Sequence, residues 1–261
     1  MAQALRRGLR YACYGGAGIA FAGCAQGAHL RLQYVCPTEP TGQQHGHAGQ
    51  GFRGKPLKLL FVGDSICIGV GAKVAAPLQA ACAEQLSKLR RRPVVWQTVA
   101  ANGADVRELQ ALFLSQRIKR SGEAEGFDFA VVFCGVNDGK KLLQGRWPSV
   151  FRDDLAKLCR VLQKEAPNSL ITVPPLDHVH APLLQTWPLR HLVNIFFSQF
   201  EAQKSVLAES GSLRCPRLEG PILGSDDRLW SDDGIHPSGE GYRHMGEWLG
   251  SNLASCVGPE E

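Results

Sequence analysis

The sequence predicts an α/β protein in which helices cover both faces of a central parallel sheet. Two observations lead to this fold class. Short apolar runs alternate along the chain with longer stretches whose apolar residues recur every three or four positions, as in buried strands and amphipathic helices. Strands that alternate with helices in this way form parallel sheets, which are buried on both faces.

Five segments are expected to be strands. Segments 57–62 and 129–134 are almost continuously apolar, which is typical of strands covered on both faces. Segment 94–99 is rich in valine and contains a tryptophan and a threonine, all strand-favouring residues. Segment 170–173 ends at a pair of prolines, which cannot continue a strand ladder. A short strand is expected near 213–218.

Five helices are expected between and after these strands. Pro77 begins the first, since proline is favoured in a first helical turn, and its apolar residues run through Leu89. Three arginines follow at 90–92, where cations favour a helix end. The other four helices are expected at 105–118, 149–164, 189–208 and 239–253.

The 261 residues divide most simply into one domain with an N-terminal extension. The first 38 residues contain no acidic side chain, and three arginines (Arg6, Arg7, Arg10) precede an uncharged stretch at 11–28. This layout is typical of a signal peptide, a weak membrane anchor or an organellar presequence. We therefore expect a targeting or membrane-anchor segment at 1–35, a flexible tether at 36–56 that is rich in glycine and proline, and the folded domain at 57–257. The predicted location is membrane-associated or exported.

Composition excludes several classes of function. The net charge of +5 comes without an aromatic-rich basic motif, so no nucleic-acid partner is expected. The nine cysteines include no Cys-x-x-Cys pair, which gives no zinc signature and no disulfide framework. Asp177-His178-Val179-His180 could ligate a metal, but without a second cluster it is interpreted as a loop near the rim of the site. No cofactor-binding fingerprint occurs, so no cofactor is expected.

Three short motifs carry polar residues that suit acyl transfer. Gly63-Asp64-Ser65 follows the first expected strand, and Gly135-Val136-Asn137-Asp138 follows the third. Asp233-Gly234-Ile235-His236-Pro237 places a carboxylate and an imidazole three residues apart. Acyl transfer needs a nucleophile, a base, an orienting acid and donors for an oxyanion. Ligands bind beyond the carboxyl ends of parallel strands, so Ser65 and Asn137 are expected at one edge of the sheet.

This set of motifs resembles the SGNH (GDSL-type) hydrolase family, from about residue 58 to residue 253. Ile66 stands where that family more often has Leu, and Gly103 lies where its second sequence block is expected. The resemblance implies a flavodoxin-like α/β/α sandwich. The lack of a Gly-x-Ser-x-Gly motif agrees with this, because it disfavours the common α/β-hydrolase fold.

The resemblance also implies roles for individual residues. Ser65 is the expected nucleophile, His236 its base and Asp233 the carboxylate that orients the base. Asp232 is the competing carboxylate, and the family spacing favours Asp233. Asp64 is expected to brace the turn, and Cys67 is not the expected nucleophile.

Three groups are expected to form the oxyanion hole. They are the backbone N–H groups of Ser65 and Gly103 and the side-chain amide of Asn137. The absence of a side chain at Gly103 would let its backbone approach the substrate closely.

The expected activity is hydrolysis of a carboxylic ester through an acyl-serine intermediate. The resemblance implies a small acyl ester or a (lyso)lipid as substrate. The N-terminal segment, and not the resemblance, is the reason to expect membrane association. An acyltransferase or a carbohydrate O-deacetylase would use the same groups. A non-catalytic binding module is disfavoured because it would not need Ser65, Asn137, Asp233 and His236 together. The oligomeric state is left open.

Overall fold

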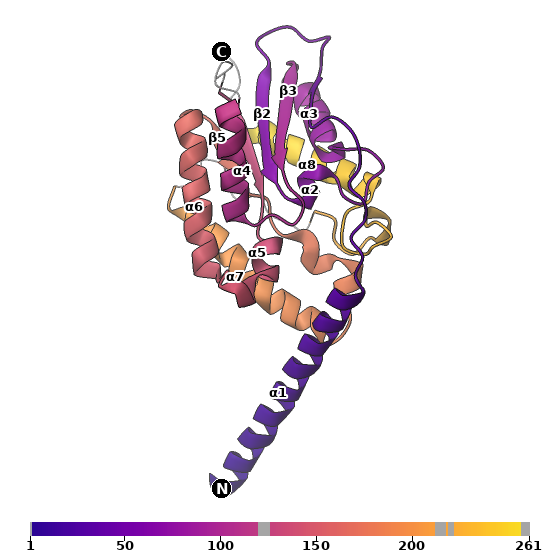
Figure 1. The fold of residues 1–261 in the computed structure, drawn as a ribbon, viewed down its shortest axis with the longest axis vertical. Coiled ribbons are helices and arrows are strands. Elements are labelled where there is room, and N and C mark those ends of the chain that lie inside the picture. The colour runs from indigo at the N-terminus through magenta and orange to yellow at the C-terminus, as the bar shows by residue number, and fades with distance from the viewer. Residues whose placement is uncertain (1, 120–125, 212–217, 219–221, 257–261) are drawn as a thin grey trace.

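The computed structural model describes residues 2–119, 126–211, 218 and 222–256, and its centre is a five-stranded sheet (Figure 1). The strand order is β1-β3-β2-β4-β5. Strands β3, β2, β4 and β5 are parallel, and β1 joins the edge of β3 in the antiparallel direction. The strands are β1 (His45–Ala48), β2 (Leu57–Gly63), β3 (Val94–Ala100), β4 (Phe129–Phe133) and β5 (Leu170–Thr172).

Helices cover both faces of this sheet, which confirms the predicted three-layer class. Two of them, α3 (Pro77–Arg90) and α8 (Gly239–Cys256), pack together on one face. The other face carries α4 (Val106–Lys119), α6 (Pro148–Glu165) and α7 (Leu189–Glu209). The remaining helices are α1 (Ala2–Gln33), the short α2 (Ser65–Ile68) and α5 (Val136–Lys140), and the 3₁₀ helices η1 (Leu142–Gln144), η2 (Asp177–His180), η3 (Pro182–Leu184) and η4 (Asp227–Leu229).

The alternation of side chains along β2 explains why its sequence is apolar throughout. Leu59 and Phe61 pack into the core under α3 and α8, whereas Leu60 and Val62 pack into the core under α4 and α6. All four side chains are buried. The strands at 57–62, 94–99, 129–134 and 170–173 and all five expected helices are present within one to three residues at each end. The strand expected near 213–218 lies outside the described residues except for Leu218.

The prediction of a flexible tether at 36–56 is wrong for the central part of this segment. Residues 45–48 form β1, whose register pairs His45 with Gln97 and Ala48 with Val94. The side chains of His45 and His47 are exposed. A Cβ atom at Gly46 would lie 2.6 Å from the Trp96 ring, so glycine lets this strand pass directly over the indole. The glycines that suggested flexibility serve close packing here.

The order in which successive strands are added to the sheet reverses between β2 and β4. The chain passes from β2 through α3 to β3 on one side, and from β4 through α6 to β5 on the other. Open α/β sheets bind ligands at such a switch point, outside the carboxyl ends of the strands. Ser65 follows β2 and Asn137 follows β4, so both residues lie at this position.

Helix α1 extends away from the domain at its N-terminal end and contacts α7 near its C-terminal end (Figure 1). Gln26 lies at this contact: its Nε2 donates to the carbonyl of Trp187 at 3.0 Å, and its Oε1 accepts from the Leu189 N–H at 3.2 Å. Across the part of the chain that the structure describes, no helix combines the length and apolarity needed to cross a membrane. The targeting or anchoring role of this segment stays a prediction.

Candidate active site

Ser65 is the first residue of α2, at the carboxyl end of β2. Gly63 makes this sharp strand-to-helix turn possible, because a Cβ atom there would lie 2.4 Å from Cys67 Sγ and 3.0 Å from Phe133 Cβ. Asp64 caps the helix by accepting the Ile66 N–H at 3.1 Å, as expected of a residue that braces the turn. Cys67 is fully buried and its pKa is raised by burial, so its thiol is inert.

The structure brings Ser65, His236 and Asp233 into one chain of contacts. His236 Nε2 lies 3.0 Å from Ser65 Oγ, and His236 Nδ1 lies 2.6 Å from Asp233 Oδ2. Both distances are within hydrogen-bond range. Asp233, and not the exposed neighbour Asp232, is the carboxylate that contacts the imidazole.

Hydrogen bonds hold the Asp233 carboxylate in one orientation. Its Oδ1 accepts from Ser231 Oγ at 2.7 Å and from the N–H groups of Ile235 and His236 at 2.9 Å each. Burial raises the pKa of Asp233, but the hydrogen bonds from His236, Ile235 and Ser231 outweigh it and hold the pKa well below its usual range. Asp233 is therefore a carboxylate at neutral pH, which is the form that orients an imidazole.

A short antiparallel bridge supports the turn that carries Asp233 and His236. Trp230 pairs with Pro237, and the Ser231 N–H donates to the His236 carbonyl at 2.8 Å. The turn closes with a 2.9 Å hydrogen bond from the Gly234 N–H to the Ser231 carbonyl. The Asp-x-x-His spacing thus allows a single turn to present both groups to Ser65.

Two backbone N–H groups are available beside Ser65. Among the described residues, neither the Ser65 N–H nor the Gly103 N–H has an acceptor in the protein. Gly103 has a positive φ of 73°, and a Cβ atom there would meet no atom within 4 Å. The left-handed backbone favours glycine, and no protein atom fills the space beside its Cα.

Asn137 is buried on the other side of the site, with its amide group already hydrogen-bonded. Its Nδ2 donates to Asp64 Oδ2 at 3.0 Å and to the Ala104 carbonyl at 3.1 Å. These contacts tie the turn after β4 to the turns after β2 and β3. A substrate oxygen would have to share or replace one of the two acceptors, which the sequence did not indicate.

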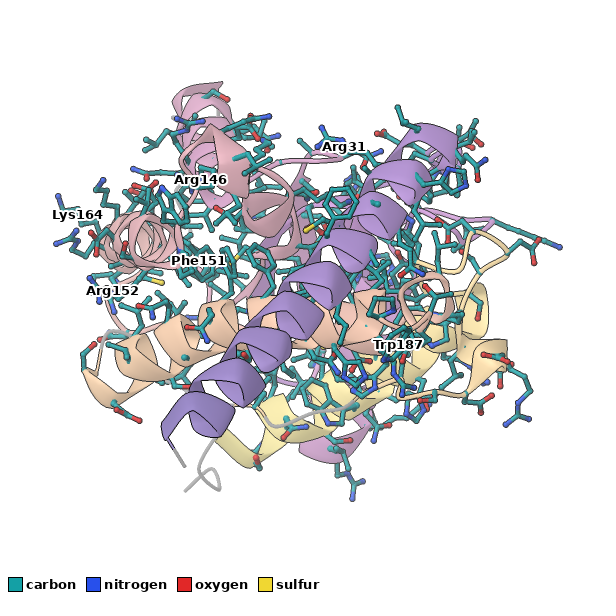
Figure 2. The ribbon with its side chains drawn as sticks, turned by 90° about the horizontal axis from the view of Figure 1, so that it is seen from below. Arg31, Arg146, Phe151, Arg152, Lys164 and Trp187 are labelled. Atoms are coloured by element: carbon teal, nitrogen blue, oxygen red, sulfur yellow. The ribbon has the colours of Figure 1, made fainter. Side chains whose placement is uncertain are left out.

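A buried ion-pair network lies beneath these turns and was not anticipated from sequence. Arg146, labelled in Figure 2, donates through Nε to Asp138 Oδ1 at 3.2 Å and through Nη1 to Asp154 Oδ2 at 2.6 Å. Asp138 also accepts the Val106 N–H at 3.2 Å. Because Val106 begins α4 and Asp138 follows Asn137, this network joins the Gly103 loop to the Asn137 turn. In the sequence, the adjacent pair Asn137-Asp138 is the one feature that points to this network.

His178 belongs to a 3₁₀ helix and is buried, not exposed on a rim loop. Its neighbour Asp177 accepts hydrogen bonds from the N–H groups of Ile222 and Leu223, which fixes the segment in place.

A cavity of about 20 Å³, which has room for one water molecule, has Asp64 and His178 in its wall. In the described parts of the chain no group of three His, Cys, Asp or Glu side chains could hold a metal ion.

Burial lowers the pKa of His178 to about 3, and the neighbouring charge of His236 contributes in the same direction. The folded protein therefore keeps His178 neutral, whereas the unfolded chain protonates it below its ordinary value of about 6.5. Stability from this residue is complete above that value and is lost as the pH falls toward 3. At about pH 5 the loss amounts to roughly 2 kcal/mol.

We expect this loss to disappear in His178→Asn, whatever the variant costs at neutral pH. Urea denaturation of both proteins at about pH 7.5 and about pH 5 would measure it. The wild type should lose roughly 2 kcal/mol more than the variant between the two conditions. Equal losses would show that His178 titrates normally in the folded state.

Comparison with known proteins agrees with this fold and site. The chain matches the GDSL-like Lipase/Acylhydrolase family over residues 61–244. The lipase Lip_vut3 from a goat rumen metagenome has a similar structure, with a TM-score of 0.61 and 18% identity over 75% of this chain and 97% of the lipase. A lipase/acylhydrolase from Enterococcus faecalis gives 0.57 and 18% over 78% of this chain and 99% of that one. A catalytic mutant of Axe2, an acetylxylan esterase from Geobacillus stearothermophilus, gives 0.57 and 16% over 77% and 95%. No curated protein matches in sequence.

The α/β/α sandwich with a serine at the end of its first parallel strand defines an SGNH-type hydrolase fold. The family match covers more than half of the chain. This protein therefore belongs to the GDSL-like lipase/acylhydrolase family, a family of ester-bond hydrolases. The low identities to the solved structures show the shared fold alone.

Proposed function

We propose that this protein is a serine esterase that hydrolyses a carboxylic ester through an acyl-serine intermediate, with Ser65, His236 and Asp233 as its catalytic triad. The observation that carries the proposal is the unbroken contact chain from Ser65 Oγ to His236 at 3.0 Å and from His236 to Asp233 at 2.6 Å. A serine hydroxyl is a weak nucleophile unless a base takes its proton during attack. In this proposal His236 is that base and Asp233 is the carboxylate that orients it.

In the first half of the reaction, Ser65 Oγ attacks the ester carbonyl carbon while His236 Nε2 accepts the hydroxyl proton. The tetrahedral intermediate collapses, the bond to the alcohol oxygen breaks, and the alcohol leaves with the proton from Nε2. A water molecule then attacks the acyl carbon of the acyl-serine while His236 Nε2 accepts its proton. The second intermediate collapses, the bond between the acyl carbon and Ser65 Oγ breaks, Oγ takes the proton back from Nε2, and the carboxylic acid leaves. Asp233 stabilises the imidazolium in both halves without taking its proton.

The negative charge that forms on the carbonyl oxygen needs donors. In this proposal the N–H groups of Ser65 and Gly103 are two of them, and both are without an acceptor among the described residues. The Asn137 amide is the third. Its contact with the Ala104 carbonyl, at 3.1 Å, is the weaker of its two and is the one a charged oxygen would displace, since hydrogen bonds to ions are stronger than those to neutral groups.

Asn137→Ala should lower kcat by about a hundredfold or more with little change in KM, provided that KM reflects substrate binding. The lost donor bonds more strongly to the charged intermediate than to the neutral ester, and the loss corresponds to roughly 3 kcal/mol of transition-state stabilisation. Steady-state kinetics on one activated ester would measure it.

The exposed neighbour Asn102 offers a matched control, because its amide makes only a 3.7 Å contact with Cys36 Sγ. Asn102→Ala should retain kcat. Since Asn137 also links Asp64 to Ala104, the melting temperature of Asn137→Ala must be measured beside its activity. A weakened KM with unchanged kcat would make Asn137 a substrate-binding residue instead.

The proposed substrate is a small acyl ester or a lysolipid. The cavity of about 20 Å³ beside Asp64 has room for a water molecule. Leu32 in the last turn of α1 is 87% exposed and Val35 is 82% exposed, on either side of Tyr34 in the sequence. In this proposal an apolar acyl group is short or lies along this exposed segment.

Turnover across a series of esters, from acetyl to decanoyl on one alcohol, tests the function and the substrate class together. Hydrolysis that depends on Ser65 supports the proposal, and the acyl length of highest kcat/KM identifies the preferred group. Failure to hydrolyse any member of the series, by folded protein, would refute the esterase assignment.

A further inference from the structure

Tyr34, which lies outside the residues matched by the family, reaches the candidate triad from the N-terminal segment. It follows α1 directly, and its backbone N–H continues the helix by donating to the Leu30 carbonyl at 2.7 Å. Its hydroxyl donates to Asp233 Oδ2 at 2.8 Å and lies 3.2 Å from His236 Nδ1. A residue 199 positions away in sequence therefore contacts both the acid and the base.

The contact falls on the oxygen of Asp233 that matters for the imidazole. Oδ1 is already occupied by three donors from its own turn. Oδ2 is the atom that accepts from His236, and Tyr34 shares it. Burial raises the pKa of Tyr34 far above its ordinary value, and Asp233 raises it further, so the hydroxyl keeps its proton and acts as a donor.

Helix α1 is placed firmly enough to hold Tyr34 there. Figure 2 shows α1 lying across α7, with Trp187 beside the pair. A Cβ atom at Gly23 would lie 2.4 Å from Leu192 Cδ1, so the helices approach closely at this glycine. Gln26 hydrogen-bonds both the Trp187 carbonyl and the Leu189 N–H. The position of Tyr34 is thus tied to packing outside the sheet.

We propose that Tyr34 is a positioning residue of the active site, which holds the Asp233 carboxylate and moderates its interaction with His236. By donating to Oδ2, Tyr34 withdraws part of the negative charge that stabilises the imidazolium. It thereby weakens the contact between Asp233 and the imidazolium, and it makes the strength of this contact depend on the position of α1. This inference rests on the proposed function for its kinetic readout.

Other charged groups surround the pair and must be held constant in a test. Asp64 and His178 interact electrostatically with His236. Lys140 and Lys204 act in turn on these neighbours, and Tyr242 interacts with Asp233 and Tyr34. Removing only the Tyr34 hydroxyl leaves all of them in place.

The test is the pH dependence of kcat/KM in Tyr34→Phe. The acidic limb of the profile should move to higher pH by roughly 0.5 to 1 unit, which is what one hydrogen bond of ordinary net strength produces. The value of kcat at the plateau should fall several-fold because the carboxylate is held less firmly. Gln26→Ala, which loosens α1 without touching the triad, should move the limb in the same direction by a smaller amount.

Tyr242→Phe is the matched control. Tyr242 is fully buried, and its hydroxyl donates to the Val70 carbonyl at 2.7 Å and not to the triad. This variant should lose stability while its acidic limb stays in place. A limb that stays in place in folded Tyr34→Phe would overturn the proposal and leave Tyr34 a structural residue.

A second measurement separates this inference from the proposed function. The ring protons of His236 can be followed by NMR across the same pH range in free protein, without substrate. A shift of the His236 titration to higher pH in Tyr34→Phe supports the positioning role even if no ester is hydrolysed. Identical titrations in the two proteins refute it, whatever the activity.

Discussion

Ser65→Ala should reduce ester turnover by about a million-fold, to the level that binding and the oxyanion donors alone provide. The fold should survive, because among the described residues the lost hydroxyl makes a single hydrogen-bond contact, the one with His236. Ester hydrolysis by the purified variant and its melting temperature, compared with the wild type, would measure both effects. A fluorophosphonate probe should label the wild type at Ser65 and leave the variant unlabelled.

Ser169 supplies the control for this experiment. It is also buried, and its Oγ donates to the Ala166 carbonyl at 2.7 Å. Ser169 precedes β5, at the end of the sheet opposite to the site. Ser169→Ala should keep full turnover and full labelling. Undiminished turnover by Ser65→Ala, or labelling at another residue, would rule out Ser65 as the nucleophile.

His236→Ala should be nearly as damaging as Ser65→Ala, because nucleophile and base act as a unit. The variant retains the hydroxyl but lacks the imidazole, the one group that Ser65 Oγ contacts among the described residues. The double variant Ser65→Ala/His236→Ala should therefore be no slower than either single variant. Steady-state kinetics of the three proteins would measure this lack of additivity, and His244→Ala, an exposed histidine of α8, should behave as the wild type.

Variants of the two adjacent aspartates refine this result. Asp233→Asn keeps the base but removes the charge that orients it, so the loss should be about a hundredfold smaller than that of His236→Ala. Asp232→Asn should be harmless, because Asp232 is exposed and Asp233 makes the contact with His236. If Asp232→Asn is damaging and Asp233→Asn is not, the assignment of the carboxylate is wrong.

Much of this arrangement could be predicted from sequence, for a physical reason. Parallel strands covered on both faces must be apolar at every position, so segments such as 57–62 stand out. Once such strands are identified, their carboxyl ends meet at one edge, and residues that follow them converge there. This reasoning placed Ser65 and Asn137 at one edge of the sheet, where Asn137 donates to the neighbour of Ser65, Asp64.

Contacts that depend on a single close approach could not be predicted in this way. Strand β1 forms because Gly46 lets the chain cross the Trp96 ring, and a glycine among histidines carries no strand signal. Tyr34 meets Asp233 only because α1 docks on α7, and that docking depends on Gly23 and Gln26. No periodic pattern in the sequence predicts such a long-range contact.

The position of β1 has a consequence for limited proteolysis. The exposed residues 41–43 connect the segment that carries Tyr34 to the strand that covers the edge of β3. A cut in this connection would release α1 and Tyr34 but leave β1 paired with β3, so the nicked protein would stay protected against edge-to-edge aggregation. Removal of residues through Ala48 would instead uncover the backbone N–H and carbonyl groups of β3. The N-terminal region thus makes two separate contacts: Tyr34 contacts Asp233, and β1 covers the edge of β3. Cleavage at 41–43 would remove the first contact and keep the second.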